Sequence, residues 1–468
     1  RNAAPTSARA AAVAGPSLMR RSPATCAPPS SDGSSATISS AIHPAPSGRL
    51  RRIALAEASQ VATGAASRRL QTRAIAATIG SRILIFAAAF AAAALIGVKE
   101  LPINWRFPSG AEVFTGTLGH LVNPWAHWDG VWLIKIATSG YADEGGSTAF
   151  FPLLPSLLRY VGILFGGNLV LTGVVISLAC FGGSAWLLHR LVRADFDEAV
   201  ASRAVVYLAI GPLSFFFQAV YTESLFLLLS LACFVFAREG RLRLAGVMGL
   251  LAVLTRSTGV LLLIPMTYYY YQQRDWQLRR TDSHVANLLM IPEGLLVWMT
   301  YLSLAFGNPF SFAGAQTQWA RMLAAPNYTV GRAVAAVYEG GQQIISTENG
   351  ALSLSMPKLW GAVDLAVTNI IALGTLIVAA LLLWYGARRL PPAYSLFALA
   401  CLVFPLFFPA HSVPLMSFPR FALTVFPLYI SLALFTRDRR WAHVTVVTVA
   451  LLFLVLLTTK FALFSWVA

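Results

Sequence analysis

Long apolar segments restrict the fold of this chain more than any other feature of its sequence. Residues 81–98, 168–189, 244–271 and 361–386 are predominantly apolar, and each approaches or exceeds the roughly 20 residues that a helix needs to cross a bilayer. Further apolar runs cover 150–166, 204–220, 223–237, 285–306, 393–409, 421–435 and 442–466. Backbone in lipid must satisfy its own hydrogen bonds, and the runs lack the alternation of a membrane β-barrel. The sequence therefore predicts an all-α polytopic membrane protein with roughly 9–12 transmembrane or re-entrant helices.

Composition and charge exclude other classes of protein. Only 12% of the residues are charged, whereas a soluble domain has about 25%. The net charge of +16 fits arginine-rich cytoplasmic loops better than nucleic-acid binding, because the rest of the chain is so apolar. The four cysteines show no paired spacing, so we expect neither a zinc site nor a disulfide framework.

The chain divides into a basic tail and a membrane domain. Residues 1–76 are rich in Ala, Ser, Pro and Arg, a composition that predicts disorder. The membrane domain is expected over 77–468, with external loops at about 99–149 and 307–360. We expect a large first external loop that carries interfacial helices.

Arginine clusters predict the orientation of the helices. They lie at 238–243, 274–280, 388–389 and 437–440, and such clusters favour the cytoplasmic side. Since two of them flank 244–271, this run is expected to enter and leave on the same side, or to bend, with a break at 255–259. The run 150–166 contains Pro152 and Pro155 and is expected to be re-entrant or interfacial. With this topology, five charged residues open towards the external side, namely Asp129, Glu144, Glu223, Arg256 and Arg420.

The first external loop contains a short amphipathic segment. Trp128, Trp132 and Ile136 follow one another at intervals of four residues, which places them on one helical face. A helix at the membrane surface, with Trp at headgroup depth, suits this pattern. Asp129 stands at its start, where a carboxylate is favoured by the helix dipole. From the residues alone, Asp129 is either a helix cap or a functional acid.

Short motifs in a fixed order resemble those of a known family. They are His127-Trp128-Asp129, Ile136-Ala137, Gly140-Tyr141, Glu144, Ala149-Phe150-Phe151-Pro152 with Pro155, Tyr221-Thr222-Glu223-Ser224, Thr255-Arg256-Ser257 with Gly259, and Pro419-Arg420-Phe421 with Phe426-Pro427. Over about residues 80–468 the chain resembles the PIG-V-type mannosyltransferases, that is, GPI mannosyltransferase 2 and its bacterial relatives. Gly145 stands where the family tends to have His, and Thr258 where it often has Asn.

The resemblance implies a GT-C glycosyltransferase fold and a reaction. Mannose would pass from a polyprenyl-phosphate donor, of the dolichyl-phosphate type in eukaryotes, to a hydroxyl of a lipid-linked glycan, as in GPI-anchor biosynthesis. One carboxylate is enough to deprotonate the acceptor in a single inverting displacement, and Asp129 is the candidate base. A lipid monophosphate donor does not demand a metal, so no cofactor is expected to be required, although Glu144 with Asp143 leaves a divalent metal open.

Other residues receive supporting roles, each with a structural alternative. Arg256, Arg420 and Lys135 are candidates for binding the donor phosphate, because guanidinium and ammonium groups match phosphate. The alternatives are an ion pair with Glu223 for Arg256, an interface anchor for Arg420 and a snorkelling side chain for Lys135. The acceptor or supporting candidates are His127, Trp128, Glu144 and Glu223.

Two other classes of function stay open from the sequence. A transporter or lipid flippase is the main alternative, since broken helices with buried charges occur in transporters, and a non-catalytic subunit is the second. The expected partners are a polyprenyl-phosphate-mannose donor, a lipid-linked glycan and membrane lipids, with no nucleic acid. The expected location is the bacterial cytoplasmic membrane, or the endoplasmic reticulum membrane in a eukaryote.

Overall fold

The computed structural model describes residues 48–97, 107–108, 114–142, 146–345 and 356–467. The chain divides into two compact units, Arg1–Gln60 and Val61–Ala468, and the second carries the fold described below. Apart from one isolated β-bridge between Arg321 and Ala410, the described residues form helices, turns and loops. The prediction of an all-α polytopic membrane protein is confirmed.

The first helix begins earlier than the sequence predicted. Helix α1 covers Gly48–Leu95, so residues 48–76, which we assigned to the basic tail, are helical. Many residues of this stretch are Ala, the strongest helix former, and this propensity outweighs the absence of a clear apolar period. Residues 1–47 lie outside the described part of the chain.

Five helical segments among the described residues are long and apolar enough to cross a membrane. They are Ser67–Leu95 within α1, α5 (Leu169–Asp195), Ser283–Phe306, which joins η8 (Ser283–Leu289) to α10 (Met290–Phe306), Val363–Gly386 within α13 (Met356–Gly386), and α17 (Arg440–Ala462). Each of these segments overlaps a predicted apolar run, although the first begins before the predicted run 81–98.

Shorter helices are separated by breaks. They are α6 (Glu198–Ile210), η5 (Ser214–Phe217), α7 (Glu223–Arg238), α8 (Leu242–Thr255), η6 (Ser257–Leu262), α9 (Leu263–Gln272), η7 (Leu278–Arg280), α14 (Pro392–Val403), η11 (Phe404–Phe407), α15 (Phe418–Leu423) and α16 (Phe426–Thr436). Non-helical backbone at membrane depth is tolerated where protein surrounds it or where it lines a cavity. The breaks therefore indicate where a binding or catalytic site is expected within the bundle.

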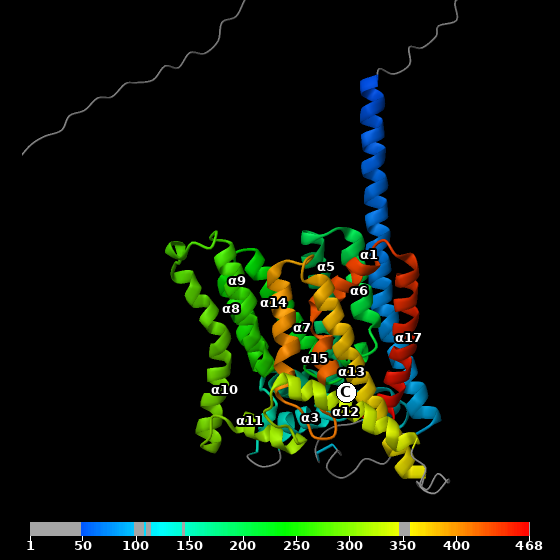
Figure 1. Cartoon of the computed structure of the whole chain (residues 1–468), viewed down its shortest axis with the longest axis vertical. Coiled ribbons are helices and arrows are strands. Elements are labelled where there is room, and N and C mark those ends of the chain that lie inside the picture. The colour runs from blue at the N-terminus through cyan, green and yellow to red at the C-terminus, as the bar shows by residue number, and fades with distance from the viewer. Residues whose placement is uncertain (1–47, 98–106, 109–113, 143–145, 346–355, 468) are drawn as a thin grey trace, which may run out of the picture. The chain divides into compact units, whose positions relative to one another are not determined.

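The two loops that are predicted to be external also contain helices. In the first are α2 (Gly116–Val122), η2 (Asn123–Ala126), α3 (Asp129–Ser139) and η3 (Ser147–Ala149), followed by α4 (Leu153–Gly162) and η4 (Ile163–Phe165). In the second are α11 (Ser311–Gly314), η9 (Ala315–Trp319) and α12 (Pro326–Ile345). At about 1.5 Å per residue, α4 with η4 is too short to cross the hydrocarbon core, as expected for 150–166. Figure 1 shows α3, α11 and α12 together at one end of the bundle.

The run 244–271 forms a hairpin, as its flanking arginines predicted. Helix α8 ends at Thr255, and a Cβ added to Gly259 would lie 2.4 Å from the backbone nitrogen of Val253. The chain therefore turns back against α8. At the far end of the hairpin, Gln273 donates a hydrogen bond to the carbonyl of Ala237 at 2.9 Å. Both ends of the run thus lie at the same end of the bundle, and the prediction is confirmed.

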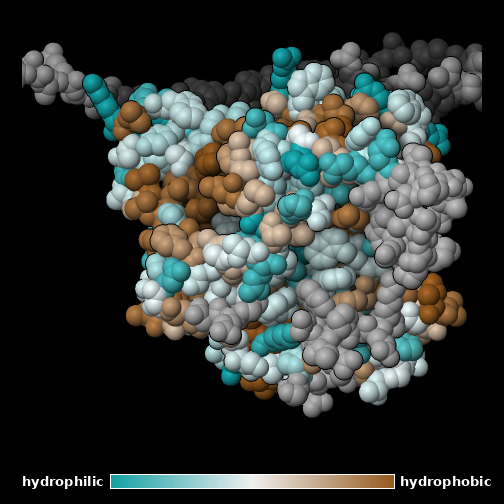
Figure 2. Space-filling model, turned by 60° about the horizontal axis from the view of Figure 1, so that its bottom comes forward, coloured by the Kyte–Doolittle hydropathy of each residue, from teal (hydrophilic) through white to brown (hydrophobic). Residues whose placement is uncertain are grey.

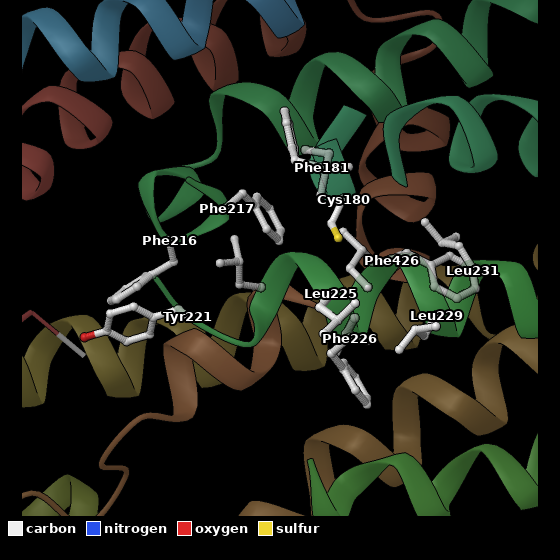
Figure 3. Close-up of a cluster of buried hydrophobic side chains, with 14 of the residues drawn as sticks. Cys180, Phe181, Phe216, Phe217, Tyr221, Leu225, Phe226, Leu229, Leu231 and Phe426 are labelled. Carbon is white, nitrogen blue, oxygen red and sulfur yellow. The ribbon is translucent and has the colours of Figure 1, made fainter. Parts of the chain in front are cut away.

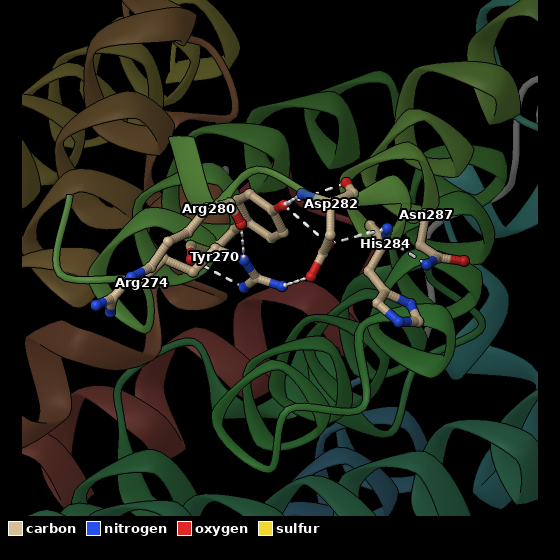
Figure 4. A network of polar contacts seen from close by, with 6 residues as sticks. All are labelled: Tyr270, Arg274, Arg280, Asp282, His284 and Asn287. Carbon is tan, nitrogen blue, oxygen red and sulfur yellow. Dashed lines mark hydrogen bonds and ion pairs between the residues drawn. The ribbon is translucent and has the colours of Figure 1, made fainter. Parts of the chain in front are cut away.

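Ion pairs mark that end of the bundle, which we call the arginine end. Arg238 at the end of α7 pairs with Asp195 at the end of α5, and Arg437 pairs with Asp197. Figure 4 shows a further network between α9 and η8, in which Arg274 and the hydroxyl of Tyr270 both contact the carboxylate of Asp282. Because clustered arginines favour the cytoplasmic side, the opposite end, at the start of α7, is the one predicted to face outwards, and we call it the external end.

An aromatic core connects the middle of the bundle to the external end. Phe181 of α5 stacks on Phe217 of η5 with ring centroids 5.2 Å apart, and Phe216 contacts Tyr221 at 5.0 Å. Figure 3 shows these rings and Phe226 of α7 within one cluster of buried hydrophobic side chains. Cys180, Cys233 and Cys401 are buried free thiols, as expected of small apolar side chains. This core holds the short segment between η5 and α7 in place.

Candidate active site

Asp129 is held at the start of α3 by contacts from the segment before α7. The backbone nitrogen of Val220 donates to the carbonyl of Trp125 at 2.8 Å, and the Tyr221 hydroxyl donates to the carbonyl of His127 at 3.0 Å. Trp128 has a φ of 57°, which non-glycine residues rarely adopt. The turn that precedes α3 is therefore strained, and hydrogen bonds from Val220 and Tyr221 hold it in place. These contacts fix the position of Asp129 at the start of α3.

Four charged residues from four helices or helix ends meet at this point. Asp129 Oδ2 lies 2.7 Å from Arg420 Nη1, and Glu223 Oε1 lies 3.0 Å from Arg420 Nε. Arg256 Nη2 donates to the same Glu223 oxygen at 3.0 Å. We call Asp129, Glu223, Arg256 and Arg420 the charge cluster. The predicted ion pair between Arg256 and Glu223 is present, and Arg420 joins it to Asp129.

The four members of the charge cluster differ in exposure. The side chain of Glu223 is fully buried, and those of Arg420 and Arg256 are 8% and 10% exposed. Asp129 is 17% exposed, which makes it the most accessible member. A molecule that approaches the cluster from solvent therefore meets the carboxylate of Asp129 before that of Glu223.

The environment of Glu223 shows why its charge is tolerated. Glu223 begins α7, where the helix N-terminus favours a carboxylate, and one of its oxygens contacts both arginines. Its other oxygen, Oε2, has no hydrogen-bond partner among the described residues. Glu223 thus contacts both guanidinium groups through one carboxylate oxygen and keeps them close to each other.

A third arginine near the cluster was missed by the sequence analysis. Arg321 lies in the second external loop, where its Nη2 donates to the carbonyl of Met416 at 3.1 Å and its guanidinium lies 5.8 Å from the Phe421 ring. Burial, and next the charge of Arg420, lower the pKa of Arg321 to about 10, so this residue is a cation at neutral pH. Among the residues that the structure describes, no carboxylate forms an ion pair with it.

Backbone pairing brings Arg321 to the site. Met322 and Ala324 donate backbone hydrogen bonds to the carbonyls of Pro409 and Phe407, each at 3.0 Å. The second external loop is thereby tied to the segment that leads into α15. A lone arginine in a loop has no local pattern that would have revealed this contact, which depends on residues almost a hundred positions away.

Three of the six non-glycine residues with positive φ among the described residues adjoin the site. Three non-glycine residues with positive φ stand near charged residues of the site: Trp128 beside Asp129, Ala320 beside Arg321, and Ser417 just before the helix of Arg420, with φ values of 57°, 52° and 63°. Such conformations cost of order 1–3 kcal/mol each and persist where the surroundings enforce them. Their position beside these charges favours a functional site over a structural ion-pair network.

The remaining predicted residues occupy different surroundings. Lys135 lies further along α3, with its ammonium 5.3 Å from the Trp132 ring, and burial lowers its pKa. The ring of His127 bonds to the carbonyl of Phe461 through Nδ1 at 3.1 Å, and burial lowers its pKa to about 4. Trp128 stacks on Phe464 with centroids 4.4 Å apart.

Two acidic candidates of the first loop cannot be placed. Glu144 and Asp143 lie outside the described residues, so the metal pair considered from the sequence lies there too. Among the residues that the structure describes, no group of three His, Cys, Asp or Glu side chains has metal-ligand proximity.

Aromatic and polar side chains adjoin the cluster on the external side. Trp132, one turn after Asp129, contacts Trp319 with centroids 6.4 Å apart, and Phe150 contacts Trp319 at 5.9 Å. Next to Trp319 is a polar hollow of about 220 Å³, lined by Gly146, Thr148, Ser311, Gly314, Ala315, Thr317 and Gln318. Figure 2 shows this end of the molecule, where hydrophobic and hydrophilic side chains are mixed.

Comparison with known proteins finds a family model that matches part of the chain. Residues 104–300 match the family model described as mannosyltransferase (PIG-V). This stretch includes Asp129, Glu223 and Arg256, whereas Arg321 and Arg420 lie beyond it. The match confirms the predicted resemblance and supports the predicted class of enzyme, a glycosyltransferase. No curated protein matches the chain.

Two solved structures are similar to the chain at low identity. One is ArnT from Cupriavidus metallidurans bound to undecaprenyl phosphate, at 14% identity and a TM-score of 0.44, with 78% of this chain and 60% of that one covered. The other is the Archaeoglobus fulgidus oligosaccharyltransferase in complex with Zn and sulfate, at 14% identity and a TM-score of 0.38, with 82% and 53% covered. The chain thus spans less than two thirds of the length of either protein.

Proposed function

We propose that this protein transfers mannose from a polyprenyl-phosphate donor to a hydroxyl of a lipid-linked glycan on the external side of the membrane. The observation that supports this most strongly is the charge cluster: a partly exposed carboxylate, Asp129, in contact with a buried arginine. The cluster lies at the opposite end of α7 from the arginine end. The family match agrees with transfer of mannose, and a lipid-linked donor is consistent with the undecaprenyl phosphate bound to ArnT.

Three arginines suit the phosphate of such a donor. Guanidinium groups bind phosphate oxygens through paired N–H donors, and Arg256, Arg420 and Arg321 supply them from three separate segments. The leaving lipid phosphate gains negative charge as the bond to the sugar breaks, so it needs cations rather than a proton. Lys135 is a fourth candidate for this contact.

The charges of the site balance through the proposed reaction. With Lys135 outside the donor contact, the three arginines exceed the carboxylates of Asp129 and Glu223 by one positive charge, which the single negative charge of a donor phosphodiester neutralises. During transfer, the acceptor proton neutralises Asp129 while the released lipid phosphate gains one negative charge. Net neutrality is therefore kept at both stages, and this balance requires Arg321.

Asp129 is the proposed general base. It takes the proton from the acceptor hydroxyl, the hydroxyl oxygen forms a bond to the anomeric carbon, and the bond between that carbon and the phosphate oxygen breaks. A single displacement inverts the anomeric centre, and positioned base catalysis contributes about 10²–10⁴-fold. Arg420 holds the carboxylate in place before the donor arrives.

We propose that the acceptor reaches Asp129 through the polar hollow next to Trp319. Trp319 and Trp132 offer apolar ring faces next to the hydroxyl and amide groups of Thr148 and Gln318, a combination that suits a sugar with one apolar and several polar faces. In this proposal Trp128, Glu144 and His127 support the loop or the acceptor. No metal is required, because the donor carries a monophosphate and the arginines supply the positive charge.

A transfer assay tests the proposal. The purified protein in lipid nanodiscs is given polyprenyl-phosphate-[¹⁴C]mannose and a lipid-linked glycan, and labelled glycolipid is measured with and without EDTA. We expect a product of inverted anomeric configuration, formed in EDTA as well. GDP-mannose serves as the control donor and should give none.

A matched variant and a transport arm separate the alternatives. Asp197→Asn removes a carboxylate at the arginine end and should leave transfer intact. Movement of the labelled lipid across proteoliposome membranes without any transfer would favour the transporter or flippase instead. The location, a bacterial cytoplasmic membrane or the endoplasmic reticulum, follows from fractionation of the native cells.

A further inference from the structure

A groove lies on the outer surface of the bundle between α1 and α5, away from the charge cluster. Its volume is about 760 Å³, within the range of about 300–1,000 Å³ that small-molecule sites occupy. Ile75 and Ile79 of α1 and Trp186 of α5 line it and are 60%, 56% and 61% exposed. Because α1 and α5 are candidate membrane spans, this exposed apolar lining faces lipid.

The lining of the groove changes from apolar to cationic along α5. Gly182, Trp186, Arg190 and Arg193 line it, and their spacing places them on one helical face. At about 1.5 Å per residue, the first and last of these residues are roughly 16 Å apart. The order is that of a lipid molecule: space for acyl chains, a Trp at the interface, and arginines at the headgroup.

Helix α1 shows the same order independently. Ile79, Ile75 and Gln71 line the groove at intervals of four residues, with the polar residue at the end of the groove near Arg193. Gln71 donates to Glu198 at 3.4 Å, and Arg193 pairs with the same carboxylate at 3.3 Å. Two separate helices therefore present apolar side chains deep in the bilayer and polar ones at its surface.

Each of the two arginines that line the groove pairs with one acid and keeps part of its guanidinium exposed. Glu239 pairs with Arg190 at 2.6 Å and with Arg241 at 3.7 Å, while Glu198 pairs with Arg193. Arg190 and Arg193 remain 52% and 57% exposed. A guanidinium has five N–H donors, so both retain donors for a further anion.

We propose that this groove binds one anionic phospholipid of the cytoplasmic leaflet. Its phosphate contacts Arg190 and Arg193, and an acyl chain lies along Trp186 and Ile79 over Gly182. Basic pockets between membrane helices on the cytoplasmic side are suited to anionic headgroups. The proposal needs only that the protein spans a membrane, so it stands independently of the proposed transfer reaction, whose donor site lies at the other end of the bundle.

Native mass spectrometry of the protein released from nanodiscs tests this proposal. We expect one phosphatidylglycerol to be retained in preference to phosphatidylcholine. In the variant Arg190→Gln/Arg193→Gln, its affinity should fall about 5-fold for each arginine removed. The matched control is Arg388→Gln/Arg389→Gln, which removes two exposed arginines at the same end of the bundle and should retain the lipid.

A second variant leaves the charges in place. Gly182 has no heavy atom within 4 Å of an added Cβ, so Gly182→Phe should fold and fill the groove, with loss of the bound phosphatidylglycerol. Equal retention of the two lipids, or retention by both groove variants, would overturn the proposal. Displacement of the lipid by inorganic phosphate alone would also overturn it, because the site would then recognise an anion without acyl chains.

Discussion

Arg321 provides a sharp test, because its removal separates donor binding from folding. The substitution Arg321→Gln removes the cation that balances the donor phosphate. Arg321 forms no ion pair with a carboxylate among the described residues, so Gln at this position leaves no described carboxylate without its ion-pair partner. By contrast, Arg420→Gln would leave Asp129 without its ion-pair partner and the buried Glu223 with Arg256 alone.

The expected magnitudes follow from these contacts. A charge-assisted hydrogen bond to phosphate contributes about 1.5–3 kcal/mol, so loss of the Arg321 contact should raise the KM for the donor about 10- to 150-fold. The free energy of unfolding should change by less than about 1 kcal/mol, in the range of a substitution without a stranded charge. For Arg420→Gln, the loss of one partner of a buried ion pair predicts about 3–5 kcal/mol of destabilisation.

The assay is steady-state transfer at saturating acceptor, with thermal unfolding measured on the same preparations. Arg321→Lys should restore part of the donor affinity, since it keeps the charge without the guanidinium fork. Arg332→Gln removes an exposed arginine of α12 and serves as the matched control. An unchanged KM for the donor in Arg321→Gln, with a Tm as low as that of Arg420→Gln, would refute the charge-balance argument.

Three further predictions concern the hairpin, the acceptor and pH. Gly259→Ala should lower stability by at least about 1–3 kcal/mol, because the new Cβ meets backbone, whereas Gly374→Ala, with open space around it, should not lower Tm. Trp319→Ala should raise the KM for the acceptor about 2- to 13-fold at an unchanged KM for the donor, and the lipid-facing Trp384→Ala should raise neither. His127 has a pKa lowered by burial to about 4, below its unfolded value of about 6.5, so its neutral form stabilises the fold above pH 6.5 and this stability is lost as the pH falls towards 4. Tm measured between pH 7 and 5 should therefore fall less steeply in His127→Asn; an equal slope would exclude His127 as the cause.

Much of the fold could be predicted because lipid imposes simple rules on a sequence. The apolar runs predicted the spanning helices. The arginine clusters on both sides of 244–271 predicted that this run returns to the side from which it starts. Asp129, Glu223, Arg256 and Arg420 were predicted to open towards the same side, and the structure brings these four together.

What could not be predicted depends on contacts between distant parts of the chain. Asp129 and Arg420 are far apart in sequence, so their ion pair follows only from the packed helices. Arg321 reaches the site because residues 322 and 324 pair with the segment at 407–409, a pairing with no local signal. The early start of α1 was missed because helix propensity, rather than an apolar period, determines it.

The catalytic role of Asp129 is tested most directly by measuring donor binding and turnover together in purified Asp129→Asn. The amide keeps the size of the carboxylate and an oxygen that can accept from Arg420, but it cannot take a proton. We expect a kcat lowered about 10²–10⁴-fold with donor affinity within a few-fold of the parent. A variant that retains more than a tenth of the parental kcat would contradict the role of Asp129 as general base.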